Sequence, residues 1–323
     1  MAEFPGEFEF IARLLKPLAG HEAALGLADD AAILEPSPAK SLVLTKDMLV
    51  EGVHYLAGDP PGDIAAKALR VNLSDLAAMG ATPVAYLMGI SRNERQGLSW
   101  MEQFVEGLAR DQATFGLSLI GGDTTATPGP MTISITALGE VPSGRALRRN
   151  GAQPGDVVLV SGTIGDACLG LGVARGEIEG DADGFLLGRY RLPTPRLPLA
   201  PLLSRYAHAA IDVSDGLVAD LGHIAEESGM RAVIEAARVP LSPPAKALVD
   251  ARPGLIADLI TGGDDYELLL TTPRNMADDL ILAAADLHIP LTPIGHIEGG
   301  RGVAVLQSDG KEMALARPGY MHF

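Results

Sequence analysis

The sequence predicts an α/β protein built from two domains. Segments with the apolar spacing of helices alternate along the chain with short apolar or period-two segments typical of strands. At about 150 residues per domain, the 323 residues suggest two domains. A basic, turn-rich stretch around Asn150 separates two halves of similar texture. We therefore expect one domain over residues 1–150 and a second over residues 151–323.

Apolar periodicity predicts the elements of the first half. They are helices over Glu7–Leu18, Asp63–Met79 and Trp100–Phe115, and strands over Ser41–Leu44, Leu117–Ile120 and Met131–Leu138. The clearest is the helix over Asp63–Met79, because its apolar residues lie near one stripe and Gly80 follows as a stop signal. The strand that ends at Leu44 is expected to deliver Thr45 and Asp47 at its carboxyl end.

The second half repeats the order of strand, glycine turn, aspartate and helix. The expected elements are a strand over Val157–Ser161, a helix over Asp166–Ala174, a strand-like segment over residues 209–216 (AAIDVSDG) and a helix over Leu217–Ser228. Four prolines make Pro193–Pro201 a rigid connector, and a further apolar run leads into Gly262–Asp265.

Charge and cysteine content exclude several classes of protein. With 41 acidic and 25 basic side chains, the net charge of −16 repels phosphate backbones and argues against nucleic acid as a partner. The single cysteine, Cys168, excludes an internal disulfide and a thiolate metal site, so the cytoplasm is the expected location. No apolar run approaches about 18 residues and Met1–Gly6 lacks a basic start, so we expect no membrane or targeting segment.

Aspartates recur beside glycines and at the ends of apolar runs, where carboxylates seldom lie without a partner. They are Asp29, Asp30, Asp47, Asp75, Asp123, Asp212, Asp215, Asp264 and Asp265. If they converge, their mutual repulsion requires cations, and nearby lysines and arginines are too few. Oxygen ligands in this number indicate Mg²⁺. A lone Asp215-Gly216 is more often a turn or helix cap, but recurrence favours a shared cleft.

Other candidates also have a structural alternative. Asn72 and Asp75 share a helix face, which is either part of a metal–phosphate site or a polar edge. Gly121–Thr125 either offers backbone N–H groups to a phosphate or forms a tight turn. His54 and Arg149 are candidate substrate and phosphate contacts, although such residues are more often structural or solvated. Neither a P-loop nor a correctly spaced dinucleotide fingerprint occurs.

Ten short motifs follow one another along the chain. They are GEFEFIARL (6–14), DDAA (29–32), LTKDMLVEGVH (44–54), NLSDLAAMGA (72–81), GGDTT (121–125), RRNGAQPGD (148–156), SGTIGD (161–166), IDVSDGLVADLGHI (211–224), GGDDYELLL (262–270) and GYMHF (319–323). In this order, and over nearly the whole chain, they resemble those of the thiamine-monophosphate kinase family. That family belongs to the superfamily of aminoimidazole ribonucleotide synthetase and selenophosphate synthetase.

The resemblance implies an architecture and a set of site residues. Residues 1–150 would bind metal and ATP and form a barrel with the same sheet of a homodimer partner, while residues 151–323 would complete the cleft. Several Mg²⁺ ions, ATP as co-substrate and thiamine monophosphate are implied, with no membrane partner. The implied metal ligands are Asp30, Thr45, Asp47, Asp75, Asp123, Asp212 and Asp215. The implied ATP contacts are Gly122, Asp123, Arg149 and Ser214, and the implied thiamine phosphate contacts are His54, Asp264 and Tyr320.

The implied reaction, a step of thiamine diphosphate biosynthesis, moves the γ-phosphoryl group of ATP onto the phosphate of thiamine monophosphate. That acceptor is largely dianionic at neutral pH, because the second pKa of a phosphate monoester is about 6. No general base and no covalent nucleophile are therefore expected. The difficulty lies in the repulsion between two anions, which metal ions held by the aspartates would offset.

Three positions depart from the family pattern and keep two alternatives open. Ala28 replaces the glycine before DDAA, Lys46 replaces the second Thr or Ser of LTTD, and Val105 replaces a tyrosine. One alternative is another ATP-using synthetase of the superfamily, although selenophosphate enzymes generally carry a reactive Cys or selenocysteine near the N-terminus and the sole cysteine here is Cys168. The other is a nucleotide-binding regulatory homologue without turnover.

Overall fold

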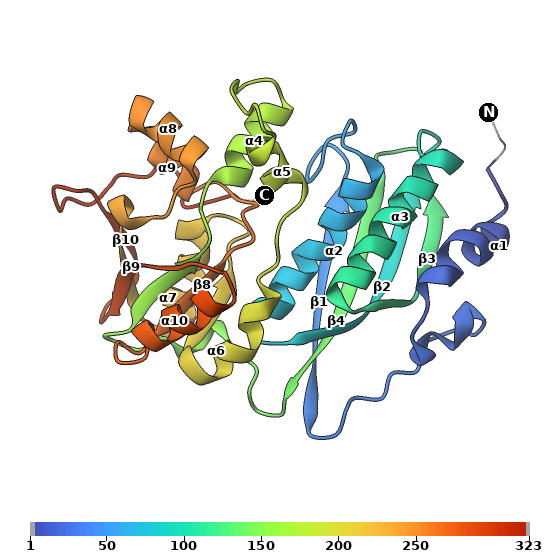
Figure 1. The fold of residues 1–323 in the computed structure, drawn as a ribbon, viewed down its shortest axis with the longest axis horizontal. Helices are drawn as coiled ribbons and strands as arrows, with labels where there is room; N and C mark the ends of the chain where they lie inside the picture. The colour runs from blue at the N-terminus through green and yellow to red at the C-terminus, as the bar shows by residue number, and fades with distance from the viewer. Residues whose placement is uncertain (1–3, 321–323) are drawn as a thin grey trace. The chain divides into compact units, whose positions relative to one another are not determined.

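The structure, a computed structural model, describes residues 4–320 and divides into two compact units (Figure 1). The first unit holds residues 1–76 and 81–144, and the second holds residues 77–80 and 145–323. The ends of the chain, Met1–Glu3 and the last three residues of the GYMHF motif, lie outside the described residues. Within residues 4–320, no helix has the length and apolar character needed to cross a membrane.

The first unit is a four-stranded sheet with two long helices on one face. The strand order is β1 (Lys40–Val50), β4 (Thr132–Pro142), β2 (Thr82–Arg92) and β3 (Ser118–Ala126), and only β2 and β3 run parallel. The helices are α2 (Pro61–Ala78) and α3 (Leu98–Phe115), which confirms both predicted helices (Figure 1). In β4, Ile133 and Ile135 are fully buried while Ser134 and Thr136 are half-buried, so one face of the sheet packs against the helices.

The N-terminal segment is helical, as expected, but it is not one regular helix. It contains α1 (Glu7–Phe10), a π-helical turn over Ile11–Leu15 and 3₁₀ turns over Lys16–Leu18 and Glu22–Leu27. Apolar side chains at positions 10, 15 and 18 are buried, so tertiary packing holds these short turns in place.

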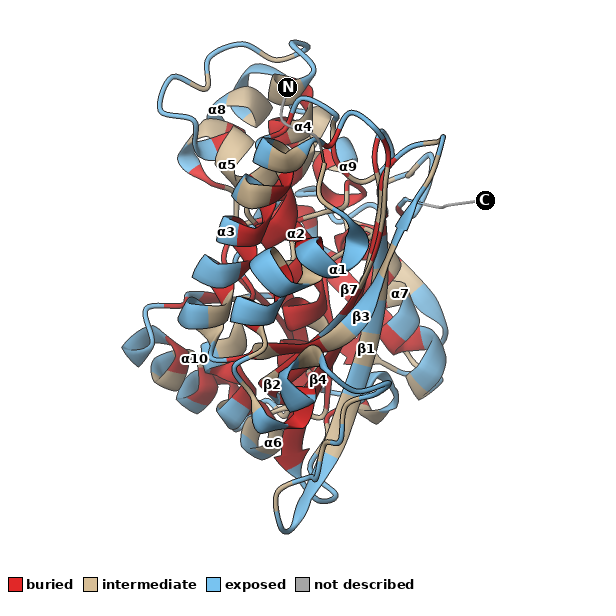
Figure 2. Ribbon diagram, turned by 90° about the vertical axis from the view of Figure 1, so that its right-hand side faces the viewer, coloured by how far each residue is buried: buried red, intermediate tan, exposed pale blue. Residues whose placement is uncertain are grey.

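The strand predicted to end at Leu44 is longer than expected. β1 continues to Val50 because it pairs with β4 without a break, from Lys40 opposite Pro142 to Val50 opposite Thr132. Much of this edge strand is exposed or half-exposed (Figure 2). Thr45, Lys46 and Asp47 therefore lie inside a strand, where alternate side chains face opposite sides of the sheet.

Residues 121–125 also lie inside a strand rather than in a turn. They belong to β3, which pairs with β2, and the register shifts by one residue at Tyr86/Leu87. Gly122 has φ +156°, and a Cβ there would lie 1.9 Å from the carbonyl oxygen of Met88. Only glycine allows the two strands to approach so closely at this irregularity. No element was predicted from the sequence over β2.

The second unit is a six-stranded sheet in the order β10-β7-β9-β5-β8-β6. These strands are β5 (Val157–Ser161), β6 (Ala209–Asp212), β7 (Arg231–Glu235), β8 (Leu268–Thr272), β9 (Leu291–Glu298) and β10 (Gly302–Leu306). The helices are α4 (Asp166–Ala174), α5 (Phe185–Arg191), α6 (Ala200–Tyr206), α7 (Leu217–Ser228), α8 (Pro243–Ala251), α9 (Leu255–Ile260) and α10 (Ala277–Asp286). The predicted elements β5, α4 and α7 are confirmed with their bounds.

Two apolar cores cover the faces of this second sheet. Leu217, Leu221 and Ile224 of α7 belong to one core together with inward residues of β5, β6 and β7. Leu203 of α6 and Leu280 of α10 belong to the other. The predicted connector, residues 193–201, is only partly a connector, because a 3₁₀ turn and the start of α6 occupy its second half. Proline fits the first turn of a helix, where its missing N–H group has no partner to lose.

A buried ion pair joins the two helices of the first unit, and its removal should destabilise the fold. Arg70 of α2 donates from Nε and Nη2 to the carboxylate of Asp111 of α3 at 2.7 and 2.8 Å, and the Asp111 side chain is 4% exposed. Because Asp111→Asn leaves the guanidinium without its counter-charge, we expect a loss of about 2 kcal/mol in the free energy of unfolding, measured by urea denaturation.

The matched control is the exposed pair formed by Arg13 and Glu102, whose side chains are 46% and 44% exposed. Glu102→Gln should change the free energy of unfolding by less than about 0.5 kcal/mol. Equal effects of the two substitutions would show that burial does not strengthen the Arg70–Asp111 pair.

Candidate active site

An oxygen-rich cluster lies between β1 and α2 in the first unit. Thr45 and Asp47 are two residues apart on β1, so their side chains share the face toward α2. The Thr45 hydroxyl donates to Asp75 Oδ2 at 2.5 Å. One turn earlier on α2, Asn72 Oδ1 accepts the backbone N–H of Asp47 at 3.1 Å. The structure therefore brings Thr45, Asp47, Asn72 and Asp75 together.

The two carboxylates of this cluster cannot easily be charged together. Burial first, and the charge of Asp75 second, raise the pKa of Asp47 from 3.8 to about 7. A hydroxyl and two carboxylates offer only oxygen ligands, which is the donor set of a hard divalent cation such as Mg²⁺. The residues present thus fit the metal that the sequence predicts, and a cation there would relieve the repulsion.

The three departures from the family pattern do not disturb this cluster. Lys46 faces the opposite side of β1 from Thr45 and Asp47, and its ammonium group donates to the Ser134 hydroxyl. Ala28 has φ −115°, a value open to any residue, so no glycine is needed there. Val105 is buried in α3 as a core residue.

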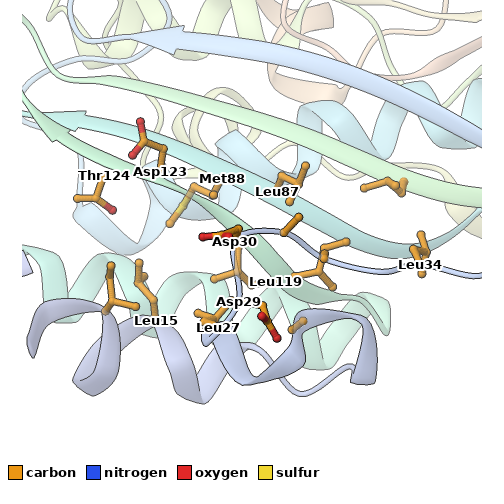
Figure 3. A pocket seen from close by; sticks show the side chains of 18 of the residues that line it. Leu15, Leu27, Asp29, Asp30, Leu34, Leu87, Met88, Leu119, Asp123 and Thr124 are labelled. Carbon is orange, nitrogen blue, oxygen red and sulfur yellow. The ribbon is translucent and has the colours of Figure 1, made fainter. Parts of the chain in front are cut away.

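Asp30 and Asp123 line a second region of the first unit, a pocket of about 630 Å³ (Figure 3). The N-terminal turns and residues of β2 and β3 form its walls, including Gly122. In Figure 3 the carboxyl groups of Asp29 and Asp30 point in different directions. Three aspartates, Asp29, Asp30 and Asp123, and the exposed backbone of Gly122 give this pocket polar groups suited to a metal or a phosphate.

The sheet separates this pocket from the oxygen-rich cluster. Across the sheet, Asp123 of β3 pairs with Gly89 of β2, and Gly89 pairs with Ser134 of β4. Ser134 in turn pairs with Met48 of β1. Three strand spacings of about 4.8 Å place Asp123 about 14 Å from β1. Within the first unit, the structure therefore groups the predicted ligands as Thr45/Asp47/Asp75 and Asp30/Asp123, and does not bring them into one cluster.

His54 lies in the turn that follows β1. Its Nδ1 accepts the backbone N–H of Val50 at 3.0 Å, so the neutral ring carries its proton on Nε2. The histidine is therefore oriented by its own strand.

In the second unit, three loops meet at the end of β6. Asp212 ends this strand and is buried. Two residues of the loop that follows accept backbone hydrogen bonds through their carbonyl oxygens: Ser214 from the N–H of Asp264 at 2.8 Å, and Asp215 from the N–H of Tyr320 at 2.9 Å. The structure thus brings together Asp212, Ser214, Asp215, Asp264 and Tyr320, which the sequence predicts as site residues.

Glycines make this close meeting of loops possible. A Cβ at Gly263 would lie 2.3 Å from the carbonyl oxygen of Ser214, and a Cβ at Gly319 would lie 2.7 Å from that of Asp215. Any larger residue would separate the loops that carry Asp264 and Tyr320.

Asp220 of α7, which was not among the predicted site residues, shapes the loop after β6. Its Oδ2 accepts the backbone N–H groups of Ser214, Asp215 and Gly216 at 3.0–3.1 Å. Burial first, and the charge of Asp215 second, raise its pKa to about 7 despite these hydrogen bonds. The ligand atoms of Asp215, Asp220 and His223 lie within 4.8 Å of one another. The i, i+3 spacing of Asp220 and His223 on α7 is the signal that could have identified them.

Arg149, the predicted ATP contact from the motif RRNGAQPGD, is exposed. It begins a 3₁₀ turn over Arg149–Gly151, and its carbonyl oxygen accepts the hydroxyl of Ser228 at 3.0 Å. Its backbone is thus fixed to the end of α7, while the guanidinium remains accessible to an anion.

Two family models and several proteins of known name are similar to this chain over most of its length. Residues 28–141 match the AIR synthase related protein, N-terminal domain, and residues 153–307 match the corresponding C-terminal domain. The thiamine-monophosphate kinase of Caulobacter vibrioides is 45% identical over 98% of this chain and 91% of its own length. That of Escherichia coli K12 is 39% identical over 98% of both chains. The chain belongs to the thiamine-monophosphate kinase family.

Solved structures agree with membership of the thiamine-monophosphate kinase family. The Stenotrophomonas maltophilia enzyme is 41% identical, with a TM-score of 0.85 over 95% of this chain and 98% of that one. The protein AaThiL, complexed with AMPPCP and TMP, is 34% identical, with a TM-score of 0.79 over 98% and 97% of the two chains. The mixed α/β fold with two sheets is therefore that of the thiamine-monophosphate kinases.

The raised pKa of Asp47 predicts how the stability of this thiamine-monophosphate kinase family member depends on pH. Because the folded carboxyl holds its proton to about pH 7 and the unfolded one loses it near 3.8, this group lowers the free energy of unfolding as pH rises from about 4 to 7. In chelator, Asp47→Asn should therefore gain stability relative to wild type through this window, by about 1 kcal/mol or more at pH 8. A difference that stays constant from pH 4 to 8 in denaturation experiments would contradict the raised pKa.

Proposed function

We propose that the protein transfers the γ-phosphoryl group of ATP to thiamine monophosphate, which gives ADP and thiamine diphosphate. The observation that carries the proposal is the match, over nearly the whole chain, to AaThiL complexed with AMPPCP and TMP. The full-length identity to enzymes named thiamine-monophosphate kinase supports the same activity. The step would take place in the cytoplasm, where a free thiol such as Cys168 stays reduced.

The residues of the two units have distinct roles in this proposal. Mg²⁺, when bound, supplies positive charge that offsets the repulsion between acceptor phosphate and ATP. Several Mg²⁺ ions would share the ligands Asp30, Thr45, Asp47, Asp75, Asp123, Asp212 and Asp215. Gly122, Asp123, Arg149 and Ser214 would contact ATP. Residues 1–150 would thus carry most of the metal and nucleotide contacts, and residues 151–323 would add the rest.

The acceptor would be held by three residues of different chemistry. His54, oriented through Nδ1, offers its Nε2 proton as a hydrogen-bond donor. Asp264 provides a counter-charge for the cationic thiazolium ring, and Tyr320, 43% exposed, can offer it a π face. Because the acceptor phosphate is already an anion near neutral pH, no side chain needs to remove a proton and direct transfer is sufficient.

The proposal also includes a homodimer formed through the sheet of the first unit. The face of β1 opposite Thr45 and Asp47 carries Leu44 at 61% exposure and Met48 at 53%, and Leu87 of β2 is also exposed. Large apolar side chains in an open sheet face are typical of a protein interface. A second copy of the same sheet would cover them and close a barrel.

The activity is tested by ADP release in the presence of ATP and Mg²⁺. With thiamine monophosphate as acceptor we expect turnover, and with free thiamine almost none, because the hydroxyl of thiamine is not an anionic nucleophile. Asp75→Asn should lower kcat at least about a hundredfold by removing a metal ligand. Asp63→Asn, a control at the start of the same helix, should keep wild-type kcat.

ATP binding without acceptor-dependent ADP release would contradict the proposed function. It would instead favour a regulatory homologue. Stoichiometric transfer of label from ATP to the protein would contradict direct transfer, because no phospho-enzyme is expected.

The dimer is tested by placing charge on the exposed sheet face. Leu44→Asp combined with Met48→Asp should convert the dimer to a monomer in sedimentation experiments, because burying two carboxylates in an apolar interface is costly. Leu282→Asp is the matched control, since Leu282 of α10 is 66% exposed in the other unit. A wild type that sediments as a monomer, or a double variant that remains dimeric, would overturn this interface.

A further inference from the structure

The backbone of residues 264–267 has an unusual conformation. Asp264 has φ +72° and Tyr266 has φ +50°, both in the left-handed region that residues other than glycine seldom adopt. Such a conformation persists only where surrounding contacts hold it. Both residues alternate with deeply buried acids, Asp265 and Glu267.

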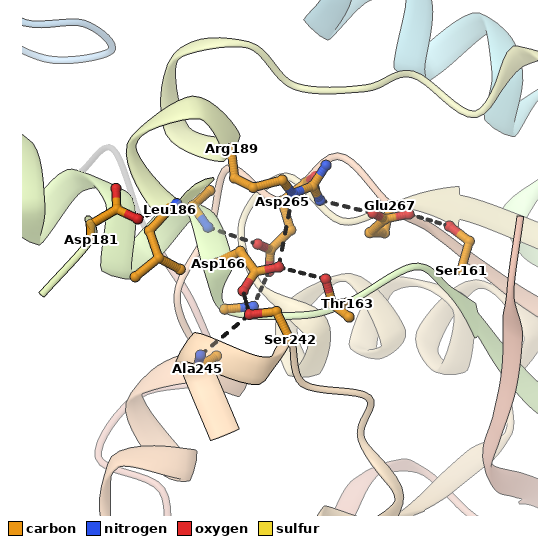
Figure 4. A network of polar contacts seen from close by, with 12 residues as sticks. Ser161, Thr163, Asp166, Asp181, Leu186, Arg189, Ser242, Ala245, Asp265 and Glu267 are labelled. Carbon is orange, nitrogen blue, oxygen red and sulfur yellow. Dashed lines mark hydrogen bonds and ion pairs between the residues drawn. The ribbon is translucent and has the colours of Figure 1, made fainter. Parts of the chain in front are cut away.

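Asp265 fixes the first half of this segment to α4. It is 1% exposed, and its carboxylate accepts the backbone N–H groups of Gly165 and Ala167 at 2.6 and 3.2 Å. These N–H groups lie at the start of the helix and have no partner within it, so the carboxylate caps α4. Arg189 also donates to the carbonyl oxygen of Asp265 at 3.2 Å (Figure 4).

Glu267 fixes the second half through a buried ion-pair network. Its carboxylate, fully buried, accepts from Arg189 at 2.8 Å and from Arg196 Nε at 2.6 Å. The Ser161 hydroxyl donates to the same carboxylate, as Figure 4 shows. Because two arginines and a hydroxyl satisfy this buried charge, the segment is held rigidly on both sides of Tyr266.

The rigid segment places the side chain of Tyr266 next to that of Asp264. The phenol of Tyr266 donates to Asp264 Oδ1 at 3.3 Å. The backbone N–H groups of these two residues donate to the carbonyl oxygens of Val213 and Ser214, both at 2.8 Å, which ties the pair to the loop after β6. The side chain of Asp264 is therefore oriented by Tyr266, whose own backbone is held by a hydrogen bond to Val213.

We propose that Tyr266 is a positioning residue, which holds the Asp264 carboxylate in the orientation that recognises the positive charge of the acceptor's ring. This inference rests on the proposed function and names a determinant of specificity within it. The two buried acids anchor the backbone, so the strained conformation serves to place one carboxylate. The ligand class recognised here is a phosphate ester that carries a cationic heteroaromatic ring.

The test compares a cationic acceptor with a neutral one. Wild type and Tyr266→Phe are assayed with thiamine monophosphate and with its deaza analogue, whose ring lacks the positive charge. For Tyr266→Phe we expect KM for thiamine monophosphate to rise about fivefold to tenfold, because a hydrogen bond to a charged group is lost. KM for ATP and KM for the neutral analogue should stay within about twofold of the wild-type values. The melting temperature should stay within a few degrees of wild type.

Tyr206→Phe, which removes a phenol elsewhere in the second unit, is the matched control and should leave every constant unchanged. Asp264→Asn should remove the preference for the cationic acceptor, and adding Tyr266→Phe to it should have little further effect. Equal losses for both acceptors, or an unchanged KM for thiamine monophosphate, would overturn the role of Tyr266. A wild type that turns over neither acceptor would instead contradict the proposed function itself.

Discussion

The crowding of carboxylates on rigid elements is the constraint on which the rest of this structure depends. Asp47 and Asp75 face each other across β1 and α2, and Asp215 and Asp220 lie close together where β6 meets α7. In both places, like charges and burial oppose ionisation. Lys46, the residue next to Asp47 in the sequence, faces the other side of β1 and donates to the Ser134 hydroxyl. Divalent cations and bound phosphates would complete such sites.

The same residue type has two physical roles in this protein. Asp220 and Asp265 are buried and accept backbone N–H groups, so they shape the loops that carry the site. Asp47 and Asp75 instead face each other between β1 and α2, where the Thr45 hydroxyl donates to Asp75 and the nearby charge of Asp75 helps to raise the pKa of Asp47. Distinguishing the two roles requires coordinates, because an aspartate beside a glycine looks the same in sequence.

The elements predicted correctly from the sequence are those whose local apolar spacing matches the face that they bury in the fold. Helices α2 and α7 combine regular apolar spacing with a glycine at or near an end, and pairing in the sheet does not alter them. β1 was predicted too short because Thr45, Lys46 and Asp47 look polar, whereas continuous pairing with β4 extends the strand. β2 was missed because its segment reads as neither clean alternation nor a helix. The length of β1 and the existence of β2 therefore depend on pairing between strands far apart in the sequence, which the local pattern does not contain.

The candidate site was predicted in residue type but not in arrangement. The convergence of Ser214, Asp215, Asp264 and Tyr320 depends on contacts between loops far apart in sequence, and their spacing alone did not encode it. The separation of Asp123 from Asp47 follows from the strand order β1-β4-β2-β3, which periodicity does not reveal. Family resemblance identified the residues, while sheet topology and glycine-dependent close approaches determined which of them meet.

The most direct measurement of the central claim is thermal unfolding with and without MgCl₂ at pH 8, for wild type and for the double variant Asp47→Asn/Asp75→Asn. If the carboxylates repel one another until a cation binds, Mg²⁺ should raise the melting temperature of wild type by several degrees. The double variant should melt higher than wild type in chelator and gain much less from Mg²⁺. A double variant that melts lower in chelator and keeps the full gain from Mg²⁺ would contradict the account.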